Sequence, residues 1–258
     1  MPQLLTHQQF RACRGLDFCY LCGRSLADAE FNYDHVPPRG IFGPYDRSPP
    51  LKLPTHNECN EDWSQEDELV AQFLTPLWGH YADEHHLKLR VSLYKSGRQG
   101  VPPAMTCNMR IDRVILRWVR GFHAALYREF LPGDCKISIH LPMPEGMSSA
   151  GPEPVDPAHL KYVATIKRNR EAGRADRVVC CNAKCTYECV WDALDDGRPA
   201  CIFALDIYDW CRLGAPCYAR RSCVGLYLSG SGVPRMASRN SQIIFPFSNR
   251  NALDAFAD

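Results

Sequence analysis

The chain has 258 residues, a formal net charge of +1, and the apolar and charged fractions of an ordinary globular protein. This length allows one large domain or two modest ones, each with a real core. The near-zero net charge excludes a global basic field, so any binding of nucleic acid has to use a local patch.

The start of the chain and its cysteines bear on the cell compartment. Residues 1–15 lack the long apolar core of a signal peptide. No stretch approaches the roughly 18 consecutive apolar residues of a membrane span. The 14 cysteines would indicate disulfides in a secreted chain. Without an export signal we expect a cytoplasmic protein with no membrane contact, in which some thiolates bind metal and the others are buried.

The first two regions differ in composition. Residues 1–78 begin as loop-rich sequence with Cys, Pro and His, and then enter a helix predicted from Ser64, where Asp67 completes an approximate capping box. Residues 79–142 are predicted to be helical. Their clearest helix, at 111–131, has apolar residues at the helical period, which we interpret as a core-facing stripe: Ile111, Val114, Ile115, Trp118, Phe122, Leu126 and Phe130.

The second half of the chain changes to β character. Residues 143–158 are rich in Pro, Gly and Ser and predict a linker or long loop. Residues 159–258 predict an antiparallel β-rich region, because short β-branched and aromatic runs recur at 177–194, 199–210, 222–228 and 241–247. The fold class is therefore α+β: a small metal-dependent module, a helical middle and a C-terminal sheet.

Two cysteine pairs have the spacing of a metal site. Cys19 and Cys22 are separated by two residues and followed by Gly23, and His56 and Cys59 repeat the gap. Together they predict a tetrahedral structural zinc site with three sulfur ligands and one nitrogen. The alternatives are a redox pair at Cys19 and Cys22, or a helix-capping His56 beside packed cysteines. Cys180, Cys181, Cys185 and Cys189 either form a second metal site, together with Cys211 or Cys217, or, as we favour, are buried in a sheet, because their three-residue gaps differ from the two-residue gap of a zinc site.

Three polar residues lie near this predicted zinc site, which we call the knuckle. Asp34 and His35 lie between its two halves, and Asn60 directly follows Cys59. If the knuckle closes, a carboxylate, an imidazole and an amide converge on one point.

The order C-x-x-C, D-H-V-P-P, H-x-x-C-N resembles the HNH, or ββα-metal, endonucleases across residues 18–68. A looser similarity to uncharacterised bacterial HNH-like proteins extends over more of the chain. The resemblance implies an N-terminal ββα-metal zinc module that hydrolyses phosphodiester bonds, with DNA as the expected substrate. It implies that Asp34 and Asn60 bind a catalytic Mg²⁺ or Mn²⁺ and that His35 is the general base on the attacking water.

The chemistry of these residues agrees with those roles. Phosphodiester hydrolysis needs an activated water and a Lewis acid beside the phosphate. Histidine titrates near neutral pH and suits base catalysis. Carboxylate and amide oxygens such as those of Asp34 and Asn60 are hard ligands that suit Mg²⁺.

Other polar residues have two interpretations each. The candidates for substrate binding are Arg39, Lys52, Lys167, Arg168 and Arg170. The last three belong to a basic run that either tracks phosphates or is a solvated face. Ser64 and Asp67 share a helical face after Asn60 and either extend the metal and water shell or, as we favour, stabilise the helix start.

The rival interpretation is a non-catalytic zinc module that binds nucleic acid or a protein partner. A structural knuckle has no need of Asp34, His35 and Asn60, and these residues therefore favour the enzyme. In a third interpretation, the zinc module only stabilises the fold, and the C-terminal cysteine-rich sheet is the functional part. HNH modules place one active site on one strand, so cleavage of a duplex would need a homodimer or two events.

Overall fold

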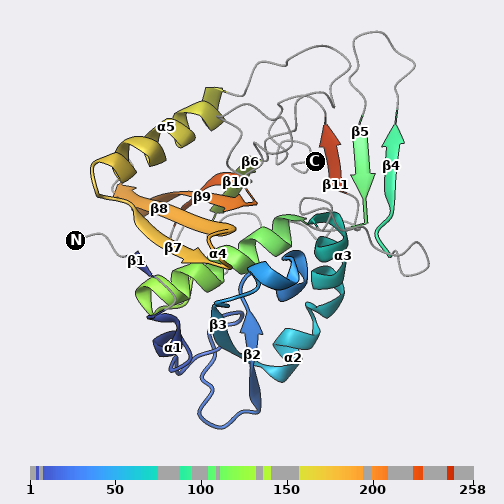
Figure 1. Ribbon diagram of the computed structural model, residues 1–258, viewed down its shortest axis with the longest axis vertical. Coiled ribbons are helices and arrows are strands. Elements are labelled where there is room, and N and C mark those ends of the chain that lie inside the picture. The colour runs from blue at the N-terminus through green and yellow to red at the C-terminus, as the bar shows by residue number, and fades with distance from the viewer. Residues whose placement is uncertain are drawn as a thin grey trace.

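The computed structural model describes residues 4–5, 8–74, 88–94, 104–108, 111–131, 136–140, 157–193, 199–208, 223–228 and 243–246 (Figure 1). Helices and sheets are mixed, so the predicted α+β class is confirmed. Among these residues, no helix is both long and apolar enough to cross a membrane.

The N-terminal part of the chain is built around a two-stranded antiparallel hairpin. Strand β2 (Phe31–His35) pairs with β3 (Lys52–His56), and two 3₁₀ turns lie between them, η1 (Arg39–Ile41) and η2 (Pro44–Asp46). Helices α2 (Asn57–Glu61) and α3 (Ser64–Leu74) follow β3 directly, and the short α1 (Phe10–Cys13) packs against β3. Leu51, Leu53 and Ile41 are fully buried beneath this hairpin.

The larger sheet has six strands in the order β1-β7-β8-β9-β10-β6. Its members are β1 (Leu4–Leu5), β6 (Lys136–His140), β7 (Asp176–Cys180), β8 (Cys185–Ala193), β9 (Pro199–Ile207) and β10 (Cys223–Leu228). All neighbours are antiparallel except β1 and β7, which are parallel. A separate three-stranded sheet joins β4 (Val91–Tyr94), β5 (Ala104–Cys107) and β11 (Ile243–Pro246).

Helix α4 (Ile111–Tyr127) runs between the hairpin and the large sheet (Figure 1). Its apolar stripe is buried as predicted at Val114, Ile115, Trp118, Phe122 and Leu126. A helix covered on several sides is apolar around much of its circumference, and the buried set accordingly extends to other faces of α4.

One contact on each side of α4 shows how it joins the two parts. On the sheet side, the ring of Phe122 stacks on that of Tyr187, with 4.8 Å between centroids. On the hairpin side, Gly121 lies so close to Val36 that a Cβ there would be 2.6 Å from Val36 Cγ1. The helix can approach the hairpin this closely only because position 121 has no side chain.

Helix α5 (Pro157–Glu171) covers the other face of the large sheet, against β8, β9 and β10. Successive side chains of β9 point to opposite faces of the large sheet. Phe203 and Leu205 belong to the main core, whereas Ile202 and Ala204 pack with Ile166 of α5. The large sheet therefore lies between α5 and α4.

Several sequence predictions can be compared with these elements. The β-rich runs after residue 176 form β7 to β11, and Cys180, Cys181, Cys185 and Cys189 are buried in the sheet as expected. The region 79–142, predicted as helical, also contains strands β4, β5 and β6, and the β-rich region begins with helix α5. The predicted linker at 143–158 falls almost entirely outside the described residues.

Candidate metal and active site

The first half of the candidate metal centre is a tight loop that carries Cys19 and Cys22. The loop closes through hydrogen bonds from the Gly23 N–H to the Cys19 carbonyl (2.8 Å) and from the Cys19 N–H to the Arg24 carbonyl (2.9 Å). Gly23 has a φ of +77°, which explains a glycine directly after the second cysteine. The ring of Phe130 also fills the space where a Cβ at position 23 would lie.

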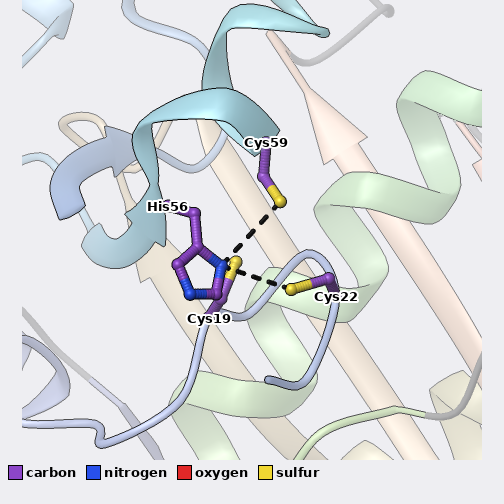
Figure 2. A group of neighbouring side chains, drawn as sticks. All are labelled: Cys19, Cys22, His56 and Cys59. Atoms are coloured by element: carbon purple, nitrogen blue, oxygen red, sulfur yellow. Dashed lines mark hydrogen bonds between the residues drawn. The ribbon is translucent and has the colours of Figure 1, made fainter. Parts of the chain in front are cut away.

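The second half comes from the junction of β3 and α2, which carries His56 and Cys59. The ligand atoms of these two residues and of Cys19 and Cys22 all lie within 4.8 Å of one another (Figure 2). His56 Nδ1 is 3.4 Å from Cys22 Sγ and 3.9 Å from Cys59 Sγ. A tetrahedral zinc ion with ordinary bond lengths requires a nitrogen–sulfur separation of about 3.6 Å.

The other ring nitrogen of His56 fixes its orientation. Nε2 lies 3.1 Å from the Ser25 carbonyl oxygen, which can only accept a hydrogen bond, so Nε2 is the donor and Nδ1 faces the sulfurs of Cys22 and Cys59. This is the outer contact expected of a metal-binding histidine. The predicted set can therefore hold a metal such as zinc.

The electrostatics of the thiols favour a cation at the centre. Burial, followed by the charges of Cys19 and Cys22, raises the pKa of Cys59 to about 12. Burial also opposes ionisation of Cys22, but hydrogen bonds led by the one from Arg24 lower its pKa to about 6. Neighbouring thiolates repel one another, and a bound cation would offset this repulsion and favour the thiolate form of Cys59.

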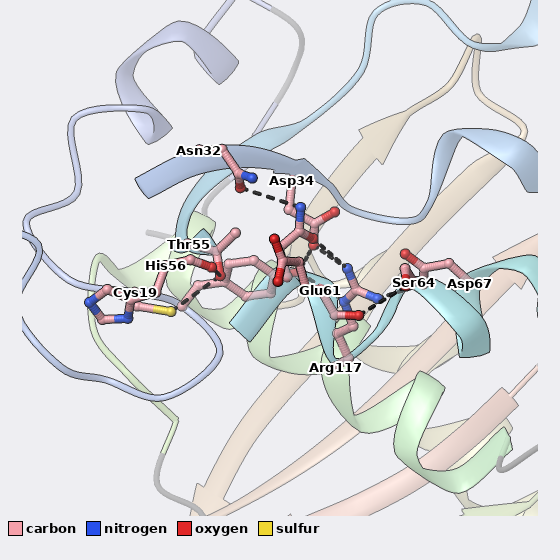
Figure 3. Close-up of polar contacts among 11 residues, drawn as sticks. Cys19, Asn32, Asp34, Thr55, His56, Glu61, Ser64, Asp67 and Arg117 are labelled. Carbon is pink, nitrogen blue, oxygen red and sulfur yellow. Dashed lines mark hydrogen bonds and ion pairs between the residues drawn. The ribbon is translucent and has the colours of Figure 1, made fainter. Parts of the chain in front are cut away.

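A second polar cluster surrounds Arg117 of α4, which is 1% exposed (Figure 3). Its Nη2 lies 2.5 Å from Asp34 Oδ2, and its Nη1 lies 2.5 Å from Asp67 Oδ1. Its Nε donates to the Tyr20 hydroxyl at 3.2 Å, and Nη2 also reaches Asn60 Oδ1 at 3.5 Å. The guanidinium thus joins four groups that come from separate segments of the chain.

Asp34 and Asn60, the two predicted ligands of the catalytic cation, are therefore brought together. The Tyr20 hydroxyl and Arg117 both donate to Asp34 Oδ2, and Oδ1 receives no hydrogen bond from the residues that the structure describes. Asn60 in turn donates from Nδ2 to Asn32 Oδ1 at 3.3 Å. Hard oxygens on Asp34 and Asn60 fit Mg²⁺ or Mn²⁺ as a donor set.

Burial shapes the titration of this cluster. Burial, and then the charge of Asp34, raises the pKa of Tyr20 well above its usual value, so the hydroxyl stays protonated and donates. Burial raises the pKa of Asp67 to about 6, opposed by Arg117 and assisted by Asp34. One guanidinium is shared between two carboxylates and cannot fully offset the desolvation of both.

Arg117 and Tyr20 were not predicted as site residues. Arg117 lies three residues after Val114 and one before Trp118, which are both buried, so helical spacing places it at the border of the apolar stripe. A charged residue at that border is a signal for a buried ion pair. The sequence contains no comparable signal for its partners, because Asp34 is 83 residues away.

The side chain of His35 lies on the opposite face of β2 from that of Asp34. Successive side chains of a strand point to opposite faces, so His35 shares a face with Tyr33 and Phe31, and Asp34 faces Arg117. Lys52 on β3 is the register partner of His35. Burial, followed by the charge of Lys52, lowers the pKa of His35; Asp34 opposes this shift, and Arg39 and Arg14 add to it. The predicted candidates Lys52 and Arg39 are therefore close enough to affect the imidazole.

The remaining predicted residues are placed as follows. Ser64 donates to the Glu61 carbonyl at 2.9 Å, and the Asp67 N–H bonds to the Trp63 carbonyl. The predicted capping box is wrong, because the Asp67 side chain binds Arg117. The three α5 cations lie across the large sheet from Asp34, two of them in ion pairs: Lys167 with Glu171, and Arg170 with Glu188, whereas Arg168 is exposed.

Comparisons with known protein families, with curated proteins and with solved structures find no match to this chain.

Proposed function

We propose that this chain is a metal-dependent endonuclease of the HNH, or ββα-metal, type that hydrolyses phosphodiester bonds, with DNA as the expected substrate. The observation that carries the proposal is the meeting of Asp34 and Asn60 at Arg117, next to a cluster of zinc-type ligands, two of which come from the end of β3 and from α2. The order β2, β3, α2 matches the order of the ββα-metal module.

The catalytic roles follow from the chemistry of each side chain. Asp34 and Asn60 would hold Mg²⁺ or Mn²⁺ through Asp34 Oδ1 and Asn60 Oδ1. When bound, such an ion offsets the negative charge that develops on the phosphate and the leaving oxygen. Arg117 and Tyr20 hold the other oxygen of Asp34 and so fix the orientation of its carboxylate.

His35 would accept the proton of the attacking water at an unprotonated ring nitrogen. Its lowered pKa keeps the imidazole neutral at neutral pH, which is the state that a general base requires. Lys52 and Arg39 add positive charge around it and would attract the phosphate. Because Asp34 and His35 face opposite sides of β2, the reacting phosphate has to lie over the end of this strand.

One observation favours the alternative, a non-catalytic zinc module that binds nucleic acid or a protein partner. The carboxylate of Asp34 already has a buried counter-ion in Arg117, and a purely structural aspartate would be expected to have one. Under this alternative, His35 and Asn60 have no role in chemistry.

Plasmid relaxation separates the two functions. We would compare the wild type with His35→Ala and Asn60→Ala in Mg²⁺, Mn²⁺ or EDTA, and measure zinc content in parallel. Asn57→Ala is the matched control for Asn60→Ala, since Asn57 lies on the same helix α2 and is likewise half-buried. The proposal expects metal-dependent nicking that both site variants lose while they retain zinc and fold.

A zinc-loaded wild type that cuts no DNA or RNA in either metal would refute the nuclease. Equal nicking by the wild type and His35→Ala would refute the role of His35. If nothing is cut, gel-shift binding of nucleic acid by the zinc-loaded chain would support the alternative.

A further inference from the structure

Strand β2 exposes two aromatic side chains on the face that carries His35. Phe31 is 45% exposed and Tyr33 is 43% exposed, although both are large and apolar. Their rings meet edge to face, with 5.9 Å between centroids. Residues 31, 33 and 35 alternate to one side of the strand, so the two rings lead toward the imidazole in steps of about 6.8 Å.

Cations surround this face. The guanidinium of Arg14, at the end of α1, lies 5.8 Å from the centre of the Tyr33 ring. Lys52 lies opposite His35 in the register of the hairpin, and the exposed Arg39 follows β2 by four residues. Asp34 lies on the other face of the strand, where its carboxylate pairs with Arg117.

This combination selects one kind of partner. Cations attract a polyanion, and exposed flat rings stack on flat apolar groups. A nucleic acid has both features only where its bases are unpaired, because a duplex hides the faces of its bases inside the stack. An acidic peptide would satisfy the cations and leave the rings exposed.

We infer that Phe31, Tyr33 and Arg14 form a stacking platform that holds the unpaired nucleotides of a single strand beside His35. The inference rests on the proposed function, since it names the strand on which the His35 site would act. Bases stack on the two rings and the phosphates follow the cations toward the end of β2. The substrate is then a single-stranded or locally unpaired segment, and a continuous duplex binds poorly.

Binding without cleavage tests the platform. A short fluorescent oligothymidylate is titrated without added Mg²⁺ or Mn²⁺, so that nothing is cut and the zinc is retained, with the wild type, Phe31→Leu, Tyr33→Leu and the double variant, and oligouridylate distinguishes DNA from RNA. Leucine keeps apolar bulk on the hairpin and removes the ring. The matched control is Tyr45→Leu, because Tyr45 is 95% exposed and lies on η2, outside β2.

The expected result is a Kd that rises about tenfold for each ring removed, as is typical of base–aromatic stacking. Tyr45→Leu should bind like the wild type. An abasic oligonucleotide of the same length should bind the wild type and the double variant equally, since it has no base to stack. Arg14→Gln should flatten the dependence of binding on salt.

Three results would overturn the inference. The double variant could bind oligothymidylate with wild-type affinity, or Tyr45→Leu could lose as much affinity as the ring variants. The double variant could also lose as much affinity for the abasic strand as for oligothymidylate. These outcomes are independent of the plasmid assay. If the wild type nicks plasmid and the double variant binds single strands normally, only the stacking platform is refuted. If the wild type binds single strands through the rings and cuts nothing, only the proposed nuclease activity is refuted.

Discussion

Arg117→Met removes the cation at the centre of the polar cluster and keeps most of the apolar stem. The carboxylate of Asp34, 7% exposed, then has no counter-ion, and Asp67 and the Tyr20 hydroxyl each lose a contact. Breaking a buried ion pair by removing one partner costs about 3–5 kcal/mol. We expect the upper part of this range, because one guanidinium serves two carboxylates.

Urea unfolding measures this loss against a matched variant on the same helix. Arg113 lies one turn earlier, pairs with Glu66 at 3.2 Å and places its guanidinium 4.6 Å from the Trp63 ring, but its side chain is 40% exposed. Solvent screens such a pair, so Arg113→Met should cost less than about 1 kcal/mol. Adding Asp34→Asn to Arg117→Met should recover part of the loss, because it removes the unpaired charge.

Two results would refute this reasoning. Equal free energies of unfolding for Arg117→Met and Arg113→Met would show that burial does not strengthen the dependence on the guanidinium. No recovery in the double variant with Asp34→Asn would show that the loss comes from packing and not from an unpaired carboxylate.

Three further predictions concern the metal, pH and packing. Cys59→Ser should abolish stoichiometric zinc and lower Tm, whereas Cys13→Ser, buried outside the cluster, should retain the metal; unchanged zinc content in Cys59→Ser would contradict the assigned ligands. The pKa of Asp67, about 6 in the fold, exceeds its unfolded value of about 3.9, so stability should fall by up to about 3 kcal/mol as pH rises from about 4 to 6. Asp67→Asn should flatten that slope in urea unfolding at a series of pH values, and an unchanged slope would assign it to another group. Gly121→Ala should lower stability by about 1–3 kcal/mol, because its Cβ would overlap Val36, although alanine favours helices by about 1 kcal/mol. Val36→Ala in the same chain should relieve the overlap, and stabilisation by Gly121→Ala alone would show that the contact relaxes.

Features that depend on short spacing could be predicted from the sequence. The gaps in Cys19, Cys22, His56 and Cys59 predicted a cluster that the structure contains. The stripe on α4 and the strands after residue 176 followed from helical and strand periods. Such patterns are readable because a few neighbouring residues fix a turn or a face, and the rest of the chain has little influence on them.

Contacts between distant residues could not be predicted, because they depend on how the whole chain folds. Among the 30 lysines and arginines of the chain, the sequence does not distinguish Arg117 as the partner of Asp34. The pairing of β1 with β7, between residues 4–5 and 177–178, is equally invisible in either segment alone. Each of these segments is compatible with many partners, and the path of the whole chain selects one.

The exposure of Phe31 and Tyr33 was decided in the same way. An aromatic run in a strand predicts a buried position, because large rings gain most from leaving water. In the fold, α1 packs against β3, and the two rings on the neighbouring strand β2 remain exposed. Burial depends on which elements lie opposite a side chain, and that arrangement exists only after the distant parts of the chain have packed together.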